Sequence, residues 1–167
     1  LADVTVTGSA ITSYTFNGLE LSTGEEVVLV STLLNSTASS TQIYLTVNGN
    51  STVTNYYEQY LTADGAGLAA ARNNLPRISQ INASSNFLST TNIKLTNNGY
   101  FTYQNTMARN FSGSAIYLNL SHTTSIFTLA QINSLTITSS VTSAISIGSR
   151  FQLYRVKGSV QQTWAIT

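Results

Sequence analysis

The sequence predicts an all-β protein, built as a sandwich or a barrel, and three observations support this prediction. β-Branched and aromatic residues run through the whole chain, as is typical of strands. Only one proline, Pro76, interrupts them. Turn-forming pairs recur at intervals that suit strands of about six to ten residues. These pairs are Thr23-Gly24, Asn48-Gly49, Asp64-Gly65, Asn98-Gly99, Ser112-Gly113 and Gly148-Ser149.

The first third of the chain contains two strand signals. Contiguous apolar residues at 27–30 predict a strand that is buried on both faces. Ile43, Leu45 and Val47 alternate with polar residues, so they are predicted to share the buried face of a second strand. An Asn-Gly pair follows this strand at once and predicts a hairpin.

The middle of the chain combines an aromatic strand with a helical signal. Residues 56–62 predict a strand on which Tyr56 and Tyr60 share one face and Tyr57 points the other way. The next segment, Leu68-Ala69-Ala70-Ala71-Arg72, consists of helix-favouring residues. It predicts one short helix inside a long loop over residues 63–75, limited downstream by the proline.

Three further segments of the second half alternate with a period of two. In the first, Ile116, Leu118 and Leu120 are predicted to point into the core. The second segment carries Leu135 and Ile137 in the same pattern. In the closing strand, the pattern predicts two core residues and three outward residues. The core residues are Phe151 and Leu153, and the outward residues are Arg150, Gln152 and Tyr154.

The chain of 167 residues is predicted to form a single β-sandwich domain over residues 1–157. Residues 158–167 are expected to form a tail or an extra strand that leads to another domain. Because the chain begins Leu-Ala-Asp, without Met, we expect a fragment of a longer polypeptide or a processed product.

Composition excludes several classes of protein. Only 8% of residues are charged and the net charge is +1, which is too weak a field for nucleic-acid binding. Ser, Thr and Asn make up 64 residues, so hydroxyls and amides solvate the surface. The absence of cysteine excludes disulfides and thiolate metal sites. No apolar run reaches the length that a transmembrane helix needs, so no membrane insertion is expected.

Candidate catalytic residues are few. His122 is the only histidine and lies in no recognisable catalytic motif, so a surface histidine is the preferred interpretation. Glu58 and Asp64 are the best candidates for a glycosidase pair, because they flank an aromatic segment. The segment that starts at Asp64 lacks the alternating oxygen ligands of a calcium loop. We therefore expect no enzyme activity, no metal and no cofactor.

Aromatic residues are the remaining candidates for binding. Exposed tyrosines can stack on sugar rings or pack in a subunit interface, whereas buried ones belong to the core. Packing in the core or at an interface is the preferred interpretation. The candidate surface or interface contacts are Tyr56, Tyr57, Tyr60, Tyr100, Tyr103 and Trp164.

Three stretches stand out, in this order: Phe16-Asn17-Gly18-Leu19-Glu20-Leu21, then Thr54-Asn55-Tyr56-Tyr57-Glu58-Gln59-Tyr60-Leu61-Thr62-Ala63-Asp64-Gly65, then Gly148-Ser149-Arg150-Phe151-Gln152-Leu153-Tyr154-Arg155. Together they resemble structural modules of tailed-bacteriophage virions, found in tail, tail-fibre and head-fibre or capsid-decoration proteins. The resemblance covers residues 12–157. Such modules often end soon after the Leu-Tyr strand, whereas this chain continues to Trp164 and Thr167.

The resemblance implies an antiparallel jelly-roll-like β-sandwich, commonly trimeric, with a structural or adhesive role and without catalysis or a cofactor. The expected function is that of a virion structural protein in fibre or tail assembly and host attachment. Expected partners are further copies of the chain, other virion proteins and a host surface glycan. Two alternatives stay open: a capsid decoration protein, and a carbohydrate-binding module of a secreted protein.

Overall fold

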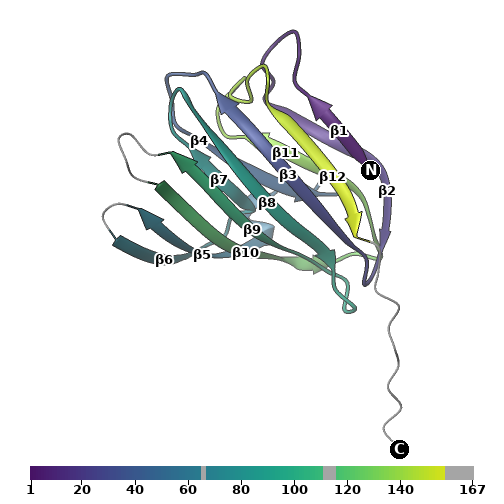
Figure 1. Ribbon diagram of the computed structural model, residues 1–167. Coiled ribbons are helices and arrows are strands. Elements are labelled where there is room, and N and C mark those ends of the chain that lie inside the picture. Colours follow the sequence, from purple (N-terminus) through teal and green to yellow (C-terminus); the bar gives the residue numbers. More distant parts are fainter. Residues whose placement is uncertain (65–66, 111–115, 157–167) are drawn as a thin grey trace, which may run out of the picture.

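A computed structural model describes residues 1–64, 67–110 and 116–156. Two antiparallel sheets pack face to face as a β-sandwich (Figure 1). One turn of 3₁₀-helix, η1 (Val53–Asn55), is the only helical element among these residues. The predicted all-β sandwich is confirmed. No helix in the described part of the chain is long and apolar enough to cross a membrane.

The two sheets differ in width. The larger sheet has eight strands, in the spatial order β1 (Ala2–Thr5), β12 (Arg150–Val156), β3 (Glu26–Asn35), β8 (Ser85–Leu95), β9 (Tyr100–Asn110), β10 (Ile116–Thr128), β5 (Tyr56–Asp64) and β6 (Gly67–Asn73). The smaller sheet has four strands, in the order β2 (Ser13–Ser22), β11 (Gln131–Ser139), β4 (Thr41–Val47) and β7 (Arg77–Ile81). The smaller sheet lies behind the larger one in Figure 1.

The strand order is that of a jelly roll with additions. The chain passes from one sheet to the other at most connections, while β5–β6 and β8–β10 stay in the larger sheet. Without β8 and β9, the larger sheet has the order β3-β10-β5-β6 against β2-β11-β4-β7 in the smaller sheet. Strands β8 and β9 form a hairpin inserted between β3 and β10, while β1 and β12 extend the sheet beyond β3. This agrees with the jelly-roll-like sandwich that the resemblance implied.

Alternating apolar residues form one core between the sheets. Ile43, Leu45 and Val47 are fully buried, as predicted. The predicted core residues of β11 and of the closing strand, which is β12, are also buried. In β3 the prediction holds only in part, because Val27 and Leu29 are fully buried while Val28 and Val30 are partly exposed on the other face.

The prediction that the leucines of β10 point inward is wrong. Leu118 and Leu120 are 49% and 52% exposed and lie on the face turned away from the smaller sheet. The intervening Asn119, Ser121 and Thr123 are the buried residues. The register with β5 and β9 determines this orientation, and a polar cluster of those neighbouring strands occupies the inner side.

The predicted helix at 68–72 is also wrong, and so is the loop around it. Residues 67–73 form β6, which pairs with β5 along its whole length, from Asp64 opposite Gly67 to Glu58 opposite Asn73. Five helix-favouring residues are too few to form a stable helix without tertiary support. Hydrogen bonds to β5 pair the backbone N–H and C=O groups along one side of β6, so the strand is favoured over the helix.

Of the predicted turns, one closes a hairpin and another connects strands of different sheets. Asn98-Gly99 closes the β8–β9 hairpin, and Gly99 adopts a φ of +80° that favours glycine. Asn48-Gly49 also forms a tight turn, with a hydrogen bond from the Asn50 N–H to the Val47 carbonyl of 2.9 Å. The predicted hairpin is absent there, because β4 and β5 lie in different sheets. The pair Ser112-Gly113 and the predicted tail, residues 158–167, lie outside the described residues.

Candidate outer-face interaction site

The face of the eight-stranded sheet that points away from the smaller sheet, called the outer face, carries an exposed apolar patch. Leu120 of β10 lies directly opposite Leu61 of β5, and both side chains are roughly half exposed. The register across five strands aligns Leu68, Ala63, Leu118, Ala108 and Leu88 in one row. The apolar patch is defined as Leu61, Ala63, Leu68, Ala70, Leu88, Ala108, Leu118 and Leu120.

This patch ends at a sheet edge without the usual protection. Among the strands that the structure describes, β6 has no neighbour on one side, and none of its residues is buried. It contains no proline and only one charge, Arg72. Single exposed apolar residues are normal, but a contiguous patch beside an open edge is typical of an interaction surface.

A row of exposed polar side chains runs next to the apolar patch. Gln59 of β5 pairs with Arg72 on one side and with His122 of β10 on the other. Gln104 of β9 lies opposite His122, and Asn92 of β8 lies opposite Gln104. All five are exposed on the outer face. This polar row is defined as Arg72, Gln59, His122, Gln104 and Asn92.

Two adjoining hollows lie along the polar row. The first is about 440 Å³ in volume, and its lining includes Tyr57, Gln59, Arg72 and His122. The second lies over Gln59 and His122 as well, and it reaches the leucines of the apolar patch. Tyr57 is 53% exposed, so an aromatic ring stands at one side of the row and apolar side chains stand at the other.

The inner side of the same strands carries a buried ion pair. Glu58 of β5 accepts a hydrogen bond of 3.2 Å from Nε of Arg77 on β7. Burial raises the pKa of the Glu58 carboxyl, and the Arg77 guanidinium opposes this rise. The guanidinium also lies over the ring of Tyr60, 4.4 Å from its centre. Oε2 of Glu58 and Nη2 of Arg77 have no hydrogen-bond partner among the described residues.

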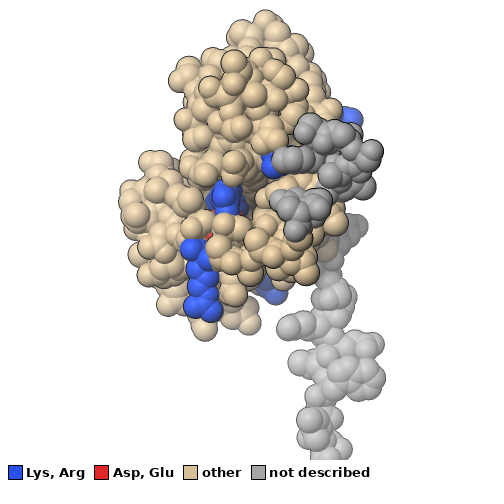
Figure 2. All heavy atoms as spheres, turned by 90° about the vertical axis from the view of Figure 1, so that its left-hand side faces the viewer, with Lys and Arg blue, Asp and Glu red and all other residues tan. Residues whose placement is uncertain are grey.

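Further polar contacts extend this cluster toward the end of the sandwich. Arg109 of β9 donates hydrogen bonds of 2.9 Å to the Gln80 carbonyl and to Oδ1 of Asn82, and its guanidinium lies 4.2 Å from the centre of the Tyr117 ring. Asn105 donates to the Ile78 carbonyl at 2.6 Å. Figure 2 views this end and shows a hollow with Lys or Arg side chains in it and beside it.

Six candidate contacts from the sequence fall into different environments. Tyr56 and Tyr103 are buried, so their prediction as surface contacts is wrong. Burial raises the pKa of Tyr56 to about 12 and that of Tyr103 well above its usual value. Tyr57 and Tyr100 are exposed, Tyr60 covers the buried arginine of the ion pair, and Trp164 lies outside the described residues.

The candidate catalytic residues from the sequence do not form a catalytic site. Glu58 and Asp64 lie six residues apart on β5, or about 20 Å along a strand, which exceeds the separation that glycosidase carboxylates require. His122 is exposed and lies 3.4 Å from the Thr102 hydroxyl. Among the residues that the structure describes, no group of three His, Cys, Asp or Glu side chains is placed to hold a metal.

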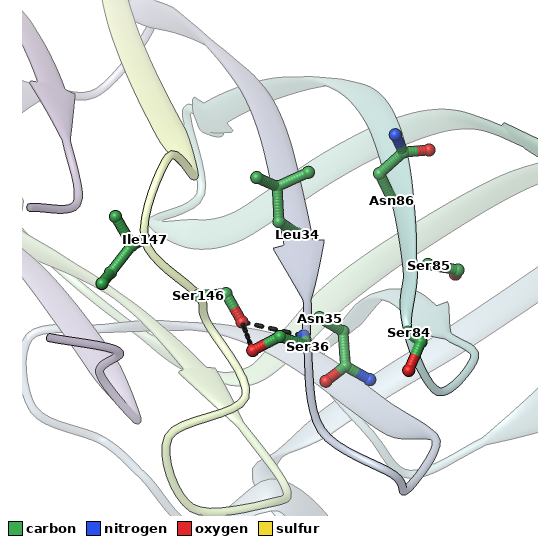
Figure 3. Close-up of a pocket in the computed structure, with 8 residues that line it drawn as sticks. All are labelled: Leu34, Asn35, Ser36, Ser84, Ser85, Asn86, Ser146 and Ile147. Atoms are coloured by element: carbon green, nitrogen blue, oxygen red, sulfur yellow. Dashed lines mark hydrogen bonds between the residues drawn. The ribbon is translucent and has the colours of Figure 1, made fainter.

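A third hollow, of about 550 Å³, lies at the C-terminal end of β3 (Figure 3). Its polar groups bond mainly to one another. The Ser36 N–H donates to the Ser146 hydroxyl at 2.8 Å, and the two hydroxyls lie 2.7 Å apart. Asn35 donates to the carbonyls of Ser39 and Asn82. These bonds hold three loops together, so a structural role accounts for this hollow.

Comparisons with protein-family models, with curated proteins and with solved structures find no match to this chain. Function must therefore be inferred from the residues and from the surfaces that they form. The sequence pointed to Tyr57 but missed the polar row beside it. The alternation after Tyr57 already placed Gln59 on the same face as Tyr57. The other members of the polar row come from other strands, and only the register between strands shows that they are neighbours of Gln59.

Proposed function

We propose that this chain is a non-enzymatic structural module of a tailed-phage virion, which assembles with further copies of itself and takes part in host attachment. The observation that carries this proposal is the apolar patch beside the open edge of β6. The low net charge of +1 adds support, because it gives little electrostatic repulsion between copies. The phage assignment depends on the resemblance of residues 12–157 to virion modules.

Association through the outer face follows from the hydrophobic effect. Leu118 and Leu120 expose about half of their surface in one chain, and burial of such surface is worth about 25 cal/mol per Å². A second copy of the same uncharged patch is a suitable partner, because the patch contains no group that must be paired when water leaves. The trimer that the resemblance implies is the expected assembly.

The test is the solution mass, measured by light scattering behind a sizing column. We expect three times the chain mass of 17.9 kDa for the unaltered protein. A double substitution, Leu118→Ser with Leu120→Ser, should give a folded monomer. The matched control is Ile147→Ser, which removes a similarly exposed apolar residue outside the patch.

A monomeric unaltered protein, or equal masses for the patch variant and the control, would contradict assembly through this surface. The capsid-decoration alternative predicts a different result. In that case the chain should bind preformed capsids without any added host factor, and the patch variant should lose this binding.

A further inference from the structure

We propose that the polar row, together with Tyr57, is a binding site for a linear, uncharged polysaccharide. This inference extends the host-attachment part of the proposed function, because it names the class of host-surface ligand and the residues that hold it. It does not require self-association, so the two proposals can fail separately.

The residue types match the two surfaces of a sugar ring. A pyranose has an apolar face of C–H bonds and a rim of hydroxyl groups that donate and accept hydrogen bonds. Tyr57 is 53% exposed and offers an aromatic face for stacking. Gln59 and Gln104 carry amides that donate and accept at once, as a hydroxyl requires. His122, when neutral, does the same with its two ring nitrogens.

The arrangement of the row favours an elongated ligand. Its five residues lie on five neighbouring strands, directly opposite one another from β6 to β8. Strands are about 4.8 Å apart, so the row spans about 19 Å. A single sugar would contact only part of this length. A linear chain laid across the strands can present one hydroxyl-bearing unit after another to successive side chains.

The charge of the site favours an uncharged ligand. Three of the five side chains in the row are amides, and His122 is the fourth. Arg72 is the only permanently charged member and lies at one end, on the edge strand. A polyanion would need repeated cationic contacts along its length, and the row does not supply them.

The site is held on regular strands. Strands β5, β8, β9 and β10 are each paired on both sides, so Gln59, His122, Gln104 and Asn92 stand on a rigid surface. Rigid placement lowers the entropic cost of binding. The first hollow, between Tyr57 and Arg72, provides a recessed starting point.

The experiment is isothermal titration calorimetry with three probes: maltohexaose, cellohexaose and the hexamer of N-acetylglucosamine. We expect the unaltered chain to bind at least one of them. Tyr57→Ala should weaken that binding about tenfold or more, through loss of the stacking face. Gln59→Ala should weaken it about fivefold. The matched control is Tyr154→Ala, another outer-face tyrosine that is 47% exposed but lies on β12, five strands away from β5.

The control should bind within about twofold of the unaltered chain, since changes away from a site have small effects. Thermal unfolding of each variant checks that it is folded. Absence of binding to all three probes, or equal losses for Tyr57→Ala and Tyr154→Ala, would overturn the inference. The solution mass of Tyr57→Ala should equal that of the unaltered chain. A monomer that still binds a probe would refute assembly while the sugar site stands.

Discussion

The ion pair between Glu58 and Arg77 should make stability depend strongly on both partners being present together. The carboxylate is 3% exposed and the arginine is 9% exposed, yet only one hydrogen bond of 3.2 Å joins them. Replacement of Arg77 by Met keeps most of the side-chain volume but leaves a buried carboxylate without its counter-ion. Loss of one member of such a pair costs about 3–5 kcal/mol.

Removal of both charges should cost far less. The pair is not bidentate, and within the described part of the chain one oxygen of Glu58 and one nitrogen of Arg77 have no hydrogen-bond partner. Coulombic attraction therefore offsets the cost of dehydration incompletely, and apolar replacements of similar volume are often neutral. We expect Glu58→Leu with Arg77→Met to lie within about 1 kcal/mol of the unaltered chain.

The pH dependence gives an independent readout. Without Arg77, the largest effect that lowers the Glu58 pKa is lost while burial still raises it, so its pKa in the folded state should rise further above that of the unfolded chain. A raised carboxyl pKa stabilises the fold at low pH, and this contribution is lost as pH rises through the folded value. The deficit of Arg77→Met should therefore be smaller at acidic pH than at neutral pH.

The assay is urea unfolding followed by far-ultraviolet circular dichroism at a fixed protein concentration, because self-association changes apparent stability. The four members of the double-mutant cycle are compared at acidic and neutral pH. A loss below about 1 kcal/mol for Arg77→Met, or a loss that does not change with pH, would refute the assignment of a buried, mutually dependent pair.

Two further predictions concern single residues. Gly99→Ala should destabilise the fold more than Gly8→Ala in urea unfolding. Both glycines have positive φ, and alanine in this conformation costs about 1–2 kcal/mol. Only at Gly99 would the added Cβ also come within 2.8 Å of a backbone oxygen. Equal losses would show that the loop moves aside. Tyr56→Phe should cost about 1–3 kcal/mol in urea unfolding, because its hydroxyl donates to the Asn50 carbonyl and accepts from the Val47 N–H. In an ultraviolet titration Tyr56 should ionise after the exposed tyrosines, near its pKa of about 12, and stability should be lost as pH rises through that value. Ionisation together with the exposed tyrosines would contradict its burial.

Local sequence was sufficient where one face of a strand meets the core and the other meets solvent. In β4, Ile43, Leu45 and Val47 alternate with more polar residues, and the hydrophobic effect alone selects the buried face. The same holds for Phe151 and Leu153 in β12. The Asn-Gly and Gly-Ser turns were also recognisable, because positive φ values depend on a few residues only.

Tertiary structure decided the part of the sheet that forms the candidate site. In β10 the apolar residues Leu118 and Leu120 lie outside, while Ser121 and Thr123 are buried. An alternating sequence pattern separates the residues of a strand into two faces, but it does not tell which groups each face contacts. Here the inner face of β10 contacts the polar cluster around Glu58. On that inner face β7 of the smaller sheet reaches β5, where Arg77 bonds to Glu58.

The residues of the proposed binding surfaces come from strands far apart in the chain. Arg72, Gln59, His122, Gln104 and Asn92 become neighbours only through pairing across β6, β5, β10, β9 and β8. Composition and alternation determined that the chain forms a polar-surfaced β-sandwich with little charge. Register and sheet order determined which side chains stand together, because backbone hydrogen bonds between distant strands carry no signal in either strand alone.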